Sequence, residues 1–269
     1  MKHRVVLLTN GSRAGQGLAH ALAMSPLDLA LIVVEQDPTP PPPKGLGALL
    51  RSTIGHNAVN RMNLWRQPRK LRHMLQVERV LQHSADLMLE QEMADMGFGA
   101  SWPGSVDLVR TLTINDPATA ELIRNARPDV LAVFGTGVLK EHMLSLAPSG
   151  ALNAHSSILP WYKGTRSEFW QCLFNDRDHV GITIHRIDPG VDTGDILFQA
   201  ATATNWPSDP FSLRSLNTIA VLKHFPNVIT DHLENRIRPR VQESIDQPTF
   251  RSRDMTVEKR MALFNRFSL

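Results

Sequence analysis

Short apolar runs alternate with segments of helical length at the start of the chain. The runs at 5–8 and 29–34 are rich in β-branched residues, and Asn10 and Gly11 end the first of them. Between the two runs, Ser12 can cap a helix that continues to Met24. Short buried runs bounded by turn residues are typical of strands in a parallel sheet. The chain therefore begins with a predicted strand–helix–strand unit with a right-handed crossover.

The same alternation resumes after residue 110. The pattern predicts strands at 112–114, 130–134 and 151–153, and helices at 117–126 and 139–147. No internal repeat is visible. This order of elements predicts an α/β fold, with a Rossmann-like, mostly parallel sheet and helices on both faces. Ligands of such sheets bind beyond the carboxyl ends of the strands.

The segment between these two halves has a different composition. Residues 38–43 read Pro-Thr-Pro-Pro-Pro-Pro, which predicts a stiff extended run at the surface. Apolar residues between 77 and 96 recur with the helical period. We predict a helical insertion at about 45–110 that packs on the sheet. Its basic residues form either a solvated face, which we favour, or a binding patch; they are Arg61, Arg66, Arg69, Lys70 and Arg72.

Two further strands, at 181–187 and 195–200, are predicted around a Pro/Gly turn that contains Asp192. A helix is predicted at 212–233, followed by a short segment near 238–241 and a basic tail at 250–269. We place a catalytic domain at 1–205, with the insertion inside it, and a C-terminal helical extension at 206–269.

Composition excludes several classes of protein. Lys and Arg number 29 against 26 Asp and Glu in 269 residues, and this balance is not typical of a nucleic-acid-binding surface. Cys172 is the one cysteine, so an intrachain disulfide and a cysteine-built metal site are excluded and a reducing compartment is favoured. No secretory leader and no run of membrane-spanning length is visible, so we expect a cytoplasmic protein.

Candidate chemistry concentrates at 153–170 and 181–196. Asn153 and His155 lie two apart at a strand end, so their side chains share a face. An amide and an imidazolium can stabilise an oxyanion, and the Asp192 carboxylate can raise the pKa of the histidine and relay a proton through water. With no Ser or Cys nucleophile beside them, they suit direct acyl transfer to an amine. The residue types alone fit structural roles equally well, with Asn153 as a turn cap, His155 as a core residue and Asp192 as a turn former.

The longer motifs narrow these alternatives. The chain contains a series of motifs that resembles the folate-dependent formyltransferases. From Asn153 onward they read Asn-x-His-x-Ser-x-Leu-Pro, Tyr-Lys-Gly, Phe-Trp, Gly-Ile-Thr-x-His and Asp-x-Gly-x-Asp-Thr-Gly-Asp-Ile. This superfamily includes methionyl-tRNA formyltransferase, glycinamide ribonucleotide formyltransferase and the nucleotide-sugar amine N-formyltransferases. The resemblance covers roughly residues 128–200. It extends weakly to residues 5–12, where Asn-Gly-Ser is similar to the phosphate-binding loop of the ribonucleotide enzyme.

The resemblance implies a formyltransferase fold and N10-formyltetrahydrofolate as formyl donor. We expect no metal, since no set of ligands with metal spacing is visible in the sequence. It implies a catalytic set of Asn153, His155 and Asp192. The residues that it implies for the pterin are Phe134, Gly135, Thr136, Gly137, Val138, Asp188, Gly190 and Val191. His185 matches a recurring histidine of the family, and a strand histidine packed near the loop is an equal interpretation.

The acceptor side is less defined. Its candidate binding residues are Asn10, Gly11, Ser12, Lys163, Thr165, Arg166 and Glu168. Arg166 and Glu168 depart from the tRNA enzymes and either face the acceptor or form a local ion pair. Glycines near the first helix can let backbone N–H groups approach phosphate, although their spacing is not that of a dinucleotide site.

The length of the chain favours one acceptor class. About seventy residues follow Ala200, which is short for the C-terminal barrel of the tRNA enzymes. We therefore expect the amino group of a nucleotide-linked amino sugar as acceptor and no nucleic acid or membrane partner, with a homodimer as the candidate assembly. The alternatives are a methionyl-tRNA or glycinamide-ribonucleotide type of formyltransferase, and, from other classes, a non-catalytic folate- or nucleotide-binding protein or a basic RNA-binding protein.

Overall fold

The computed structural model describes residues 2–36, 69–202 and 204–267. Its centre is a seven-stranded sheet with the order β3-β2-β1-β4-β5-β6-β7. The strands are β1 (Arg4–Asn10), β2 (Asp28–Glu35), β3 (Leu108–Thr111), β4 (Val130–Phe134), β5 (Ala151–His155), β6 (Gly181–Arg186) and β7 (Ile196–Ala201). The first five strands pair in parallel, and β6 pairs antiparallel with both β5 and β7. The expectation of a mostly parallel α/β sheet is confirmed.

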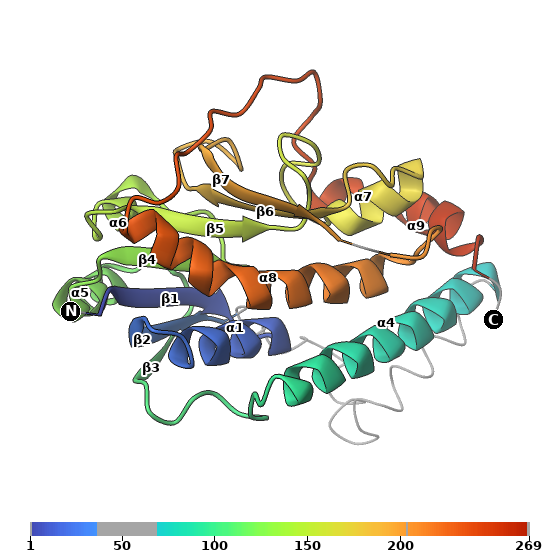
Figure 1. Cartoon of the computed structure of the whole chain (residues 1–269). Helices are drawn as coiled ribbons and strands as arrows, with labels where there is room; N and C mark the ends of the chain where they lie inside the picture. The colour runs from blue at the N-terminus through green and yellow to red at the C-terminus, as the bar shows by residue number, and fades with distance from the viewer. Residues whose placement is uncertain (1, 37–68, 203, 268–269) are drawn as a thin grey trace, which may run out of the picture.

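Helices cover both faces of the sheet. They are α1 (Arg13–Ala23), α4 (Arg69–Asp95), α5 (Pro117–Ala126), α6 (Glu141–Leu144), α7 (Ser167–Phe174), α8 (Pro210–Leu233) and α9 (Val257–Phe264), with a 3-10 turn at Ser252–Asp254. Figure 1 shows α8 running across one face of the sheet beside α1. Ser12 caps α1, since its hydroxyl accepts from the Gly15 N–H, and this prediction is confirmed.

Strand alternation produces two cores. Val5 and Leu7 of β1 point to the face that α1, the end of α4 and α8 cover. Val6 and Leu8 point to the opposite face, which α5 and α6 cover. Because successive strand side chains alternate, a strand buried on both sides needs an unbroken apolar run, and this is the pattern at 5–8.

A third cluster is rich in aromatic residues and lies beyond the end of the sheet. It joins the start of α4 and of α8 to α7 and α9. Figure 1 shows α7 and α9 side by side at this end of the molecule. The cluster fixes the position of the segment 161–170, which leads from β5 into α7.

Two sequence expectations differ from the structure. The strand predicted at 112–114 is wrong: β3 comes earlier, at Leu108–Thr111, where it pairs with β2. Leu112 is 69% exposed, while Ile114 is buried and donates its N–H to Glu35, so this apolar pair belongs to a loop. The helix predicted at 139–147 is also too long, since α6 spans four residues. Leu139 and Ala147 are buried through tertiary contacts outside the helix.

The long helix of the predicted insertion is α4, whose residues Met74, Val77 and Met93 are buried. The proline-rich run, Arg61 and Arg66 lie outside the described residues. Arg69 and Lys70 are exposed and Arg72 is half-buried, so the solvated basic face stays a prediction. The domain division at residue 205 stays a prediction. Within the described ranges, no helix has the length and apolar character needed to cross a membrane.

Candidate active site

The site begins with the pairing of β5 and β6. Asn153 on β5 lies opposite His185 on β6, and His155 lies opposite Thr183. The two predicted residues of β5 therefore face the same side, at the carboxyl end of a central strand. His155 is 7% exposed and His185 is 2% exposed, so both imidazoles depend on protein partners for their hydrogen bonds.

The environment of His155 fixes its tautomer. Nε2 lies 2.9 Å from the Tyr162 carbonyl oxygen, with the Ser167 hydroxyl 3.3 Å away. Because a carbonyl only accepts, Nε2 carries a proton. Nδ1 lies 3.5 Å from Oδ2 of Asp192. The proton that His155 can gain or lose is therefore the one on Nδ1, beside the carboxylate.

Asp192 reaches this position from the turn between β6 and β7. Its backbone is left-handed, with φ of 52°, and its Oδ2 accepts from the Gly164 N–H at 2.8 Å. Burial works to raise the pKa of this carboxyl. The charges of His155 and His185 and the hydrogen bonds from His185 and Gly164 outweigh burial and hold the pKa well below its usual value. Asp192 is thus a carboxylate that faces two imidazoles.

His185 links the other two groups. Its Nδ1 donates to the Arg186 carbonyl at 2.8 Å, so Nε2 is the variable nitrogen. Nε2 lies 3.1 Å from the Asn153 side-chain nitrogen and 3.5 Å from Oδ1 of Asp192. A neutral His185 accepts from the Asn153 amide, and a protonated His185 donates to Asp192. The histidine that the family motif singled out therefore contacts two members of the predicted catalytic set.

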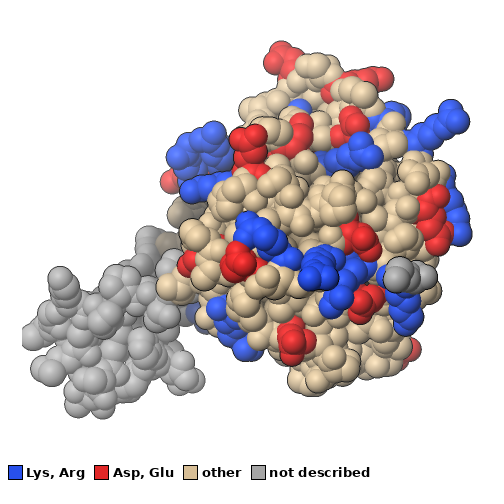
Figure 2. Space-filling model, turned by 90° about the vertical axis from the view of Figure 1, so that its left-hand side faces the viewer, with Lys and Arg blue, Asp and Glu red and all other residues tan. Residues whose placement is uncertain are grey.

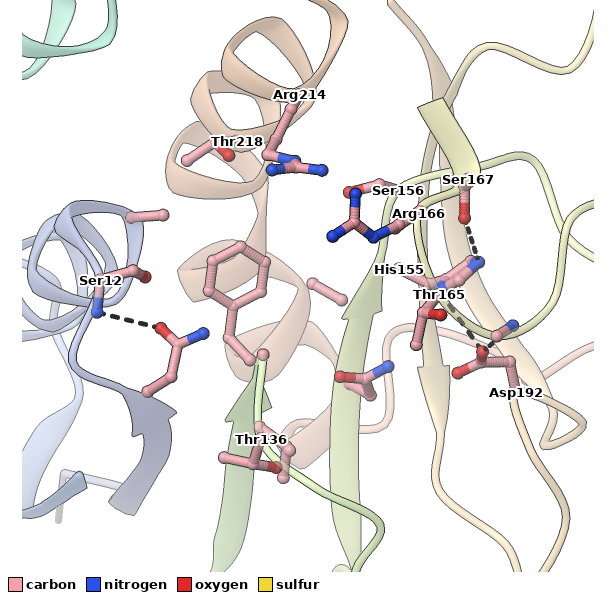
Figure 3. Close-up of a pocket in the computed structure, with 18 of the residues that line it drawn as sticks. Ser12, Thr136, His155, Ser156, Thr165, Arg166, Ser167, Asp192, Arg214 and Thr218 are labelled. Atoms are coloured by element: carbon pink, nitrogen blue, oxygen red, sulfur yellow. Dashed lines mark hydrogen bonds and ion pairs between the residues drawn. The ribbon is translucent and has the colours of Figure 1, made fainter. Parts of the chain in front are cut away.

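These groups line a cavity of about 640 Å³, a volume in the range of small-molecule sites. Figure 3 shows His155 and Asp192 on one side of this cavity and Ser12 at the start of α1 on the other. The predicted residues that line it are Asn10, Ser12, Phe134, Gly135, Thr136, Gly137, Val138, Asn153, His155, Thr165, Arg166, Glu168, Asp188, Gly190, Val191 and Asp192. Gly11 and Lys163 are not among the lining residues.

Sequence reasoning missed one wall of this cavity. Phe211, Arg214, Ser215 and Thr218 of α8 line it, and so do Gln82, Asp86 and Leu89 of α4. The α8 residues recur at helical spacing, so the helix turns one face toward the cavity. Polar residues on that face were the available signal, but the sequence alone did not show that α8 returns to the strand ends.

The structure bears on the local ion pair that was one interpretation of Arg166 and Glu168. Glu168 is buried, and its Oε1 lies 3.9 Å from Nε of Arg214 on α8. Arg166 is exposed, precedes α7 in a left-handed conformation and places its guanidinium over the Phe169 ring. The partner of Glu168 is thus a distant arginine rather than its neighbour along the chain.

The fold and this cavity define an α/β protein whose ligand site lies at the carboxyl ends of parallel strands. The family model described as formyl transferase matches residues 3–209. This is most of the chain, and the protein belongs to the formyl transferase family.

Among curated proteins, the methionyl-tRNA formyltransferase of Anaeromyxobacter dehalogenans (strain 2CP-1 / ATCC BAA-258) is 38% identical over 97 residues, which are 36% of this chain and 31% of that protein. The Geobacter sulfurreducens enzyme of the same name is 33% identical over 109 residues, 40% of this chain and 34% of that protein. The matched segment thus covers about a third of these relatives.

Solved structures show the same fold. Glycinamide ribonucleotide transformylase 1 from Symbiobacterium toebii superposes with a TM-score of 0.55 at 19% identity, covering 90% of this chain and 95% of that one. A 4-N formyltransferase from Francisella tularensis gives 0.56 at 11% identity, covering 97% and 85%. At these identities the likeness concerns the fold.

Proposed function

We propose that this protein is an N-formyltransferase that moves the formyl group of N10-formyltetrahydrofolate to a primary amine. One observation carries the proposal: Asn153, His155 and Asp192, from a strand and a distant turn, line one cavity in a chain of the formyl transferase family. An amide, an imidazole and a carboxylate together supply the donors and the proton acceptor that transfer of an acyl group to an amine needs.

The residues around the cavity fit the folate donor. Val138 and Val191, from the two loops predicted to hold the pterin, line the cavity and are 69% and 41% exposed. Exposed apolar side chains beside backbone N–H and C=O groups suit a flat heterocycle. Gly135 has φ of 72°, a left-handed conformation that favours glycine, and a Cβ there would lie 2.8 Å from the Asn10 side chain. In this donor, the formyl carbon to be transferred is bonded to N10 of the folate.

The roles of the three side chains follow from their contacts. The Asn153 amide and Nδ1 of His155 provide N–H groups that can stabilise negative charge on the formyl oxygen. Oδ2 of Asp192 lies 3.5 Å from Nδ1 of His155 and orients the imidazole. Through water, the same carboxylate can relay the proton that the attacking amine loses to N10 of the donor, so that the bond between N10 and the formyl carbon breaks and tetrahydrofolate leaves.

A covalent route through a side chain is not needed. The lone thiol, Cys172, is buried, and burial raises its pKa, so it is a poor nucleophile. The Ser167 hydroxyl donates to the Tyr162 carbonyl and does not have a free base beside it, because Nε2 of His155 carries a proton. These contacts support direct attack by the acceptor amine.

For the acceptor we propose the amino group of a nucleotide-linked amino sugar. Arg166 and Arg214 line the cavity and favour an acceptor that carries phosphate groups, and Asn10 and Ser12 line the same cavity at the start of α1. A second candidate, methionyl-tRNA, is favoured by the relatives of that activity. Figure 2 shows one face of the molecule, where Lys and Arg alternate with Asp and Glu rather than forming a continuous basic surface for RNA.

A transfer assay tests the proposal. N10-formyltetrahydrofolate is incubated with a panel of nucleotide-linked amino sugars, small phosphorylated amines, glycinamide ribonucleotide and methionyl-tRNA, and addition of one formyl group to the acceptor is read by mass spectrometry. We expect an amino sugar to be formylated, with no product from the Asn153→Ala/His155→Ala double variant. Binding of tetrahydrofolate without turnover on any member would support the non-catalytic alternative and contradict the proposal.

A further inference from the structure

Two arginines from separate elements meet at one end of the cavity. Arg166 precedes α7 and Arg214 belongs to α8, and both line the cavity. Their guanidinium carbons lie 5.2 Å and 5.5 Å from the centroid of the same ring, that of Phe169. Figure 3 shows both guanidinium groups in the space between α8 and the end of β5. Stacking on a buried ring holds two like charges near each other.

Three carboxylates lie near the arginines, and each has a contact of its own. Glu168 pairs with Nε of Arg214, and within the described residues no hydrogen bond to the terminal Nη groups of Arg214 is found. The nearby Glu78 is bound by Arg260, which donates to it through two guanidinium nitrogens. Partial burial, followed by the charges of Arg214 and Arg260, lowers the pKa of Arg166 and outweighs the opposite effect of Glu78 and Glu168. Asp86 on α4 also lines the cavity, and its carboxylate accepts from Gln82.

The arginine pair lies close to the candidate catalytic groups but apart from the loop assigned to the pterin. Ser167, which follows Arg166, lies 3.3 Å from Nε2 of His155. Figure 3 shows Arg214 and Thr218 at the end of the cavity opposite Thr136. A ligand with its amine at His155 and the folate at Thr136 would therefore place its remaining part at the arginines.

We propose that Arg166 and Arg214 form a clamp for the diphosphate of the acceptor, with the buried Glu168 as a positioning residue for Arg214. This inference rests on the proposed function, because it assigns the charged part of that acceptor. Two guanidinium forks match two phosphoryl groups, since each fork can donate two parallel hydrogen bonds to one group. The clamp selects amines that carry a diphosphate over neutral amines of the same size.

Binding of inorganic pyrophosphate, measured by isothermal titration calorimetry at low and moderate salt, tests the clamp. We expect Arg214→Gln and Arg166→Gln each to weaken binding on the order of tenfold or more, as for loss of charged hydrogen bonds. Arg214→Lys keeps the charge but not the fork, so its affinity for pyrophosphate should lie between those of the parent protein and Arg214→Gln. Arg214→Lys also provides the test at this position if Arg214→Gln fails to fold. The matched control is Lys223→Gln, also on α8, whose exposed side chain pairs with Glu92 outside the cavity.

Equal pyrophosphate binding by the parent protein and by both arginine variants would overturn the clamp. So would a loss of tetrahydrofolate affinity in Arg214→Gln that does not occur with tetrahydropteroate, because the arginines would then bind the glutamate part of the folate. The Asn153→Ala/His155→Ala variant should keep pyrophosphate binding. Arginine-dependent binding in a protein that formylates no amine would reject the proposed function while leaving the anion site in place.

Discussion

Hydrogen bonds to the backbone set the proton positions of both histidines in the site. The Tyr162 carbonyl assigns a proton to Nε2 of His155, and the Arg186 carbonyl assigns one to Nδ1 of His185. The remaining nitrogens face Asp192 and Asn153. Each imidazole thus presents one titratable nitrogen toward the same small space, and single substitutions there have distinct consequences.

Removal of either predicted oxyanion donor should slow turnover without loss of the fold. We expect Asn153→Ala or His155→Ala to lower kcat by a factor on the order of 10²–10³, the cost of losing one such donor. Circular dichroism and tetrahydrofolate binding serve as controls for folding and for the donor site. Activity retained in the double variant would contradict these roles.

Asp192 should make stability depend on pH in the acid range. Its pKa in the folded protein is lowered from the ordinary 3.8, so the ionised group stabilises the fold above that value. The benefit disappears as the pH falls through the folded-state pKa. Urea unfolding should therefore show a gap between the parent protein and Asp192→Asn that is full near neutral pH and narrows below about pH 4.

The exposed Asp246 provides the comparison for that experiment. Asp246→Asn removes a carboxylate without removing a partner of two imidazoles, so its effect on stability should be small throughout. A gap for Asp192→Asn that stayed constant from neutral to acid pH would show that its charge does not stabilise the fold.

At the scale of elements, β5 and the segment that follows it position the site. Gly164 has φ of 101° and forms a bridge to Phe250, and its N–H holds Asp192. A Cβ at this position would lie 2.0 Å from the Phe250 carbonyl oxygen. The segment 162–166 therefore depends on a glycine both for its conformation and for close approach of a second backbone.

Substitution of this glycine should be more harmful than its conformation alone implies. Gly150 also has positive φ, of 77°, but a Cβ there meets nothing within 4 Å. Gly150→Ala should cost about 1–2 kcal/mol for the left-handed backbone. Gly164→Ala should cost about 2 kcal/mol more, because the Phe250 backbone must move. Chemical denaturation measures the free energy of unfolding of both variants. Equal losses would mean that the Phe250 backbone moves away from position 164 at little cost.

At the scale of the whole molecule, the segment after α8 returns to support the site. Arg240 forms a bridge with Ile196 at the start of β7, and Gln247 accepts from the Tyr162 N–H at 2.6 Å. Between them, Gln242 donates to the carbonyls of Asp192 and Gly194 at 3.0 and 2.6 Å. Residues far from the family motifs thus hold the turn that carries the carboxylate.

Loss of the Gln242 side chain should loosen this turn. We expect Gln242→Ala to reduce stability by about 1–2 kcal/mol, the net value of two hydrogen bonds, and to lower kcat with the acceptor that the panel identifies. The neighbouring Glu243 is exposed, and Glu243→Ala should change neither quantity. Full activity in Gln242→Ala would show that the turn keeps its position without this support.

Local pattern was sufficient for a strand buried on both sides and for a helix with a clear N-terminal cap. The strand at 130–134 and the helix at 117–126 begin and end where the sequence predicts, because an apolar run and an Asp116 cap with Pro117 are local signals. The strand near 110 was misplaced because β3 is an edge strand with few buried side chains. Its position is set by its hydrogen bonds to β2 rather than by an apolar run of its own.

The sequence by itself determined the class of fold, the family resemblance and the candidate set of Asn153, His155 and Asp192, since spacing within strands and motifs is a local property. Only the tertiary structure decided that His185 contacts two of them, that Arg214 rather than Arg166 pairs with Glu168, and that α4, α8 and Gln242 complete the site. Those contacts join residues far apart along the chain. They form only when packing of the helices on the sheet brings the segments together, and no local pattern records that packing.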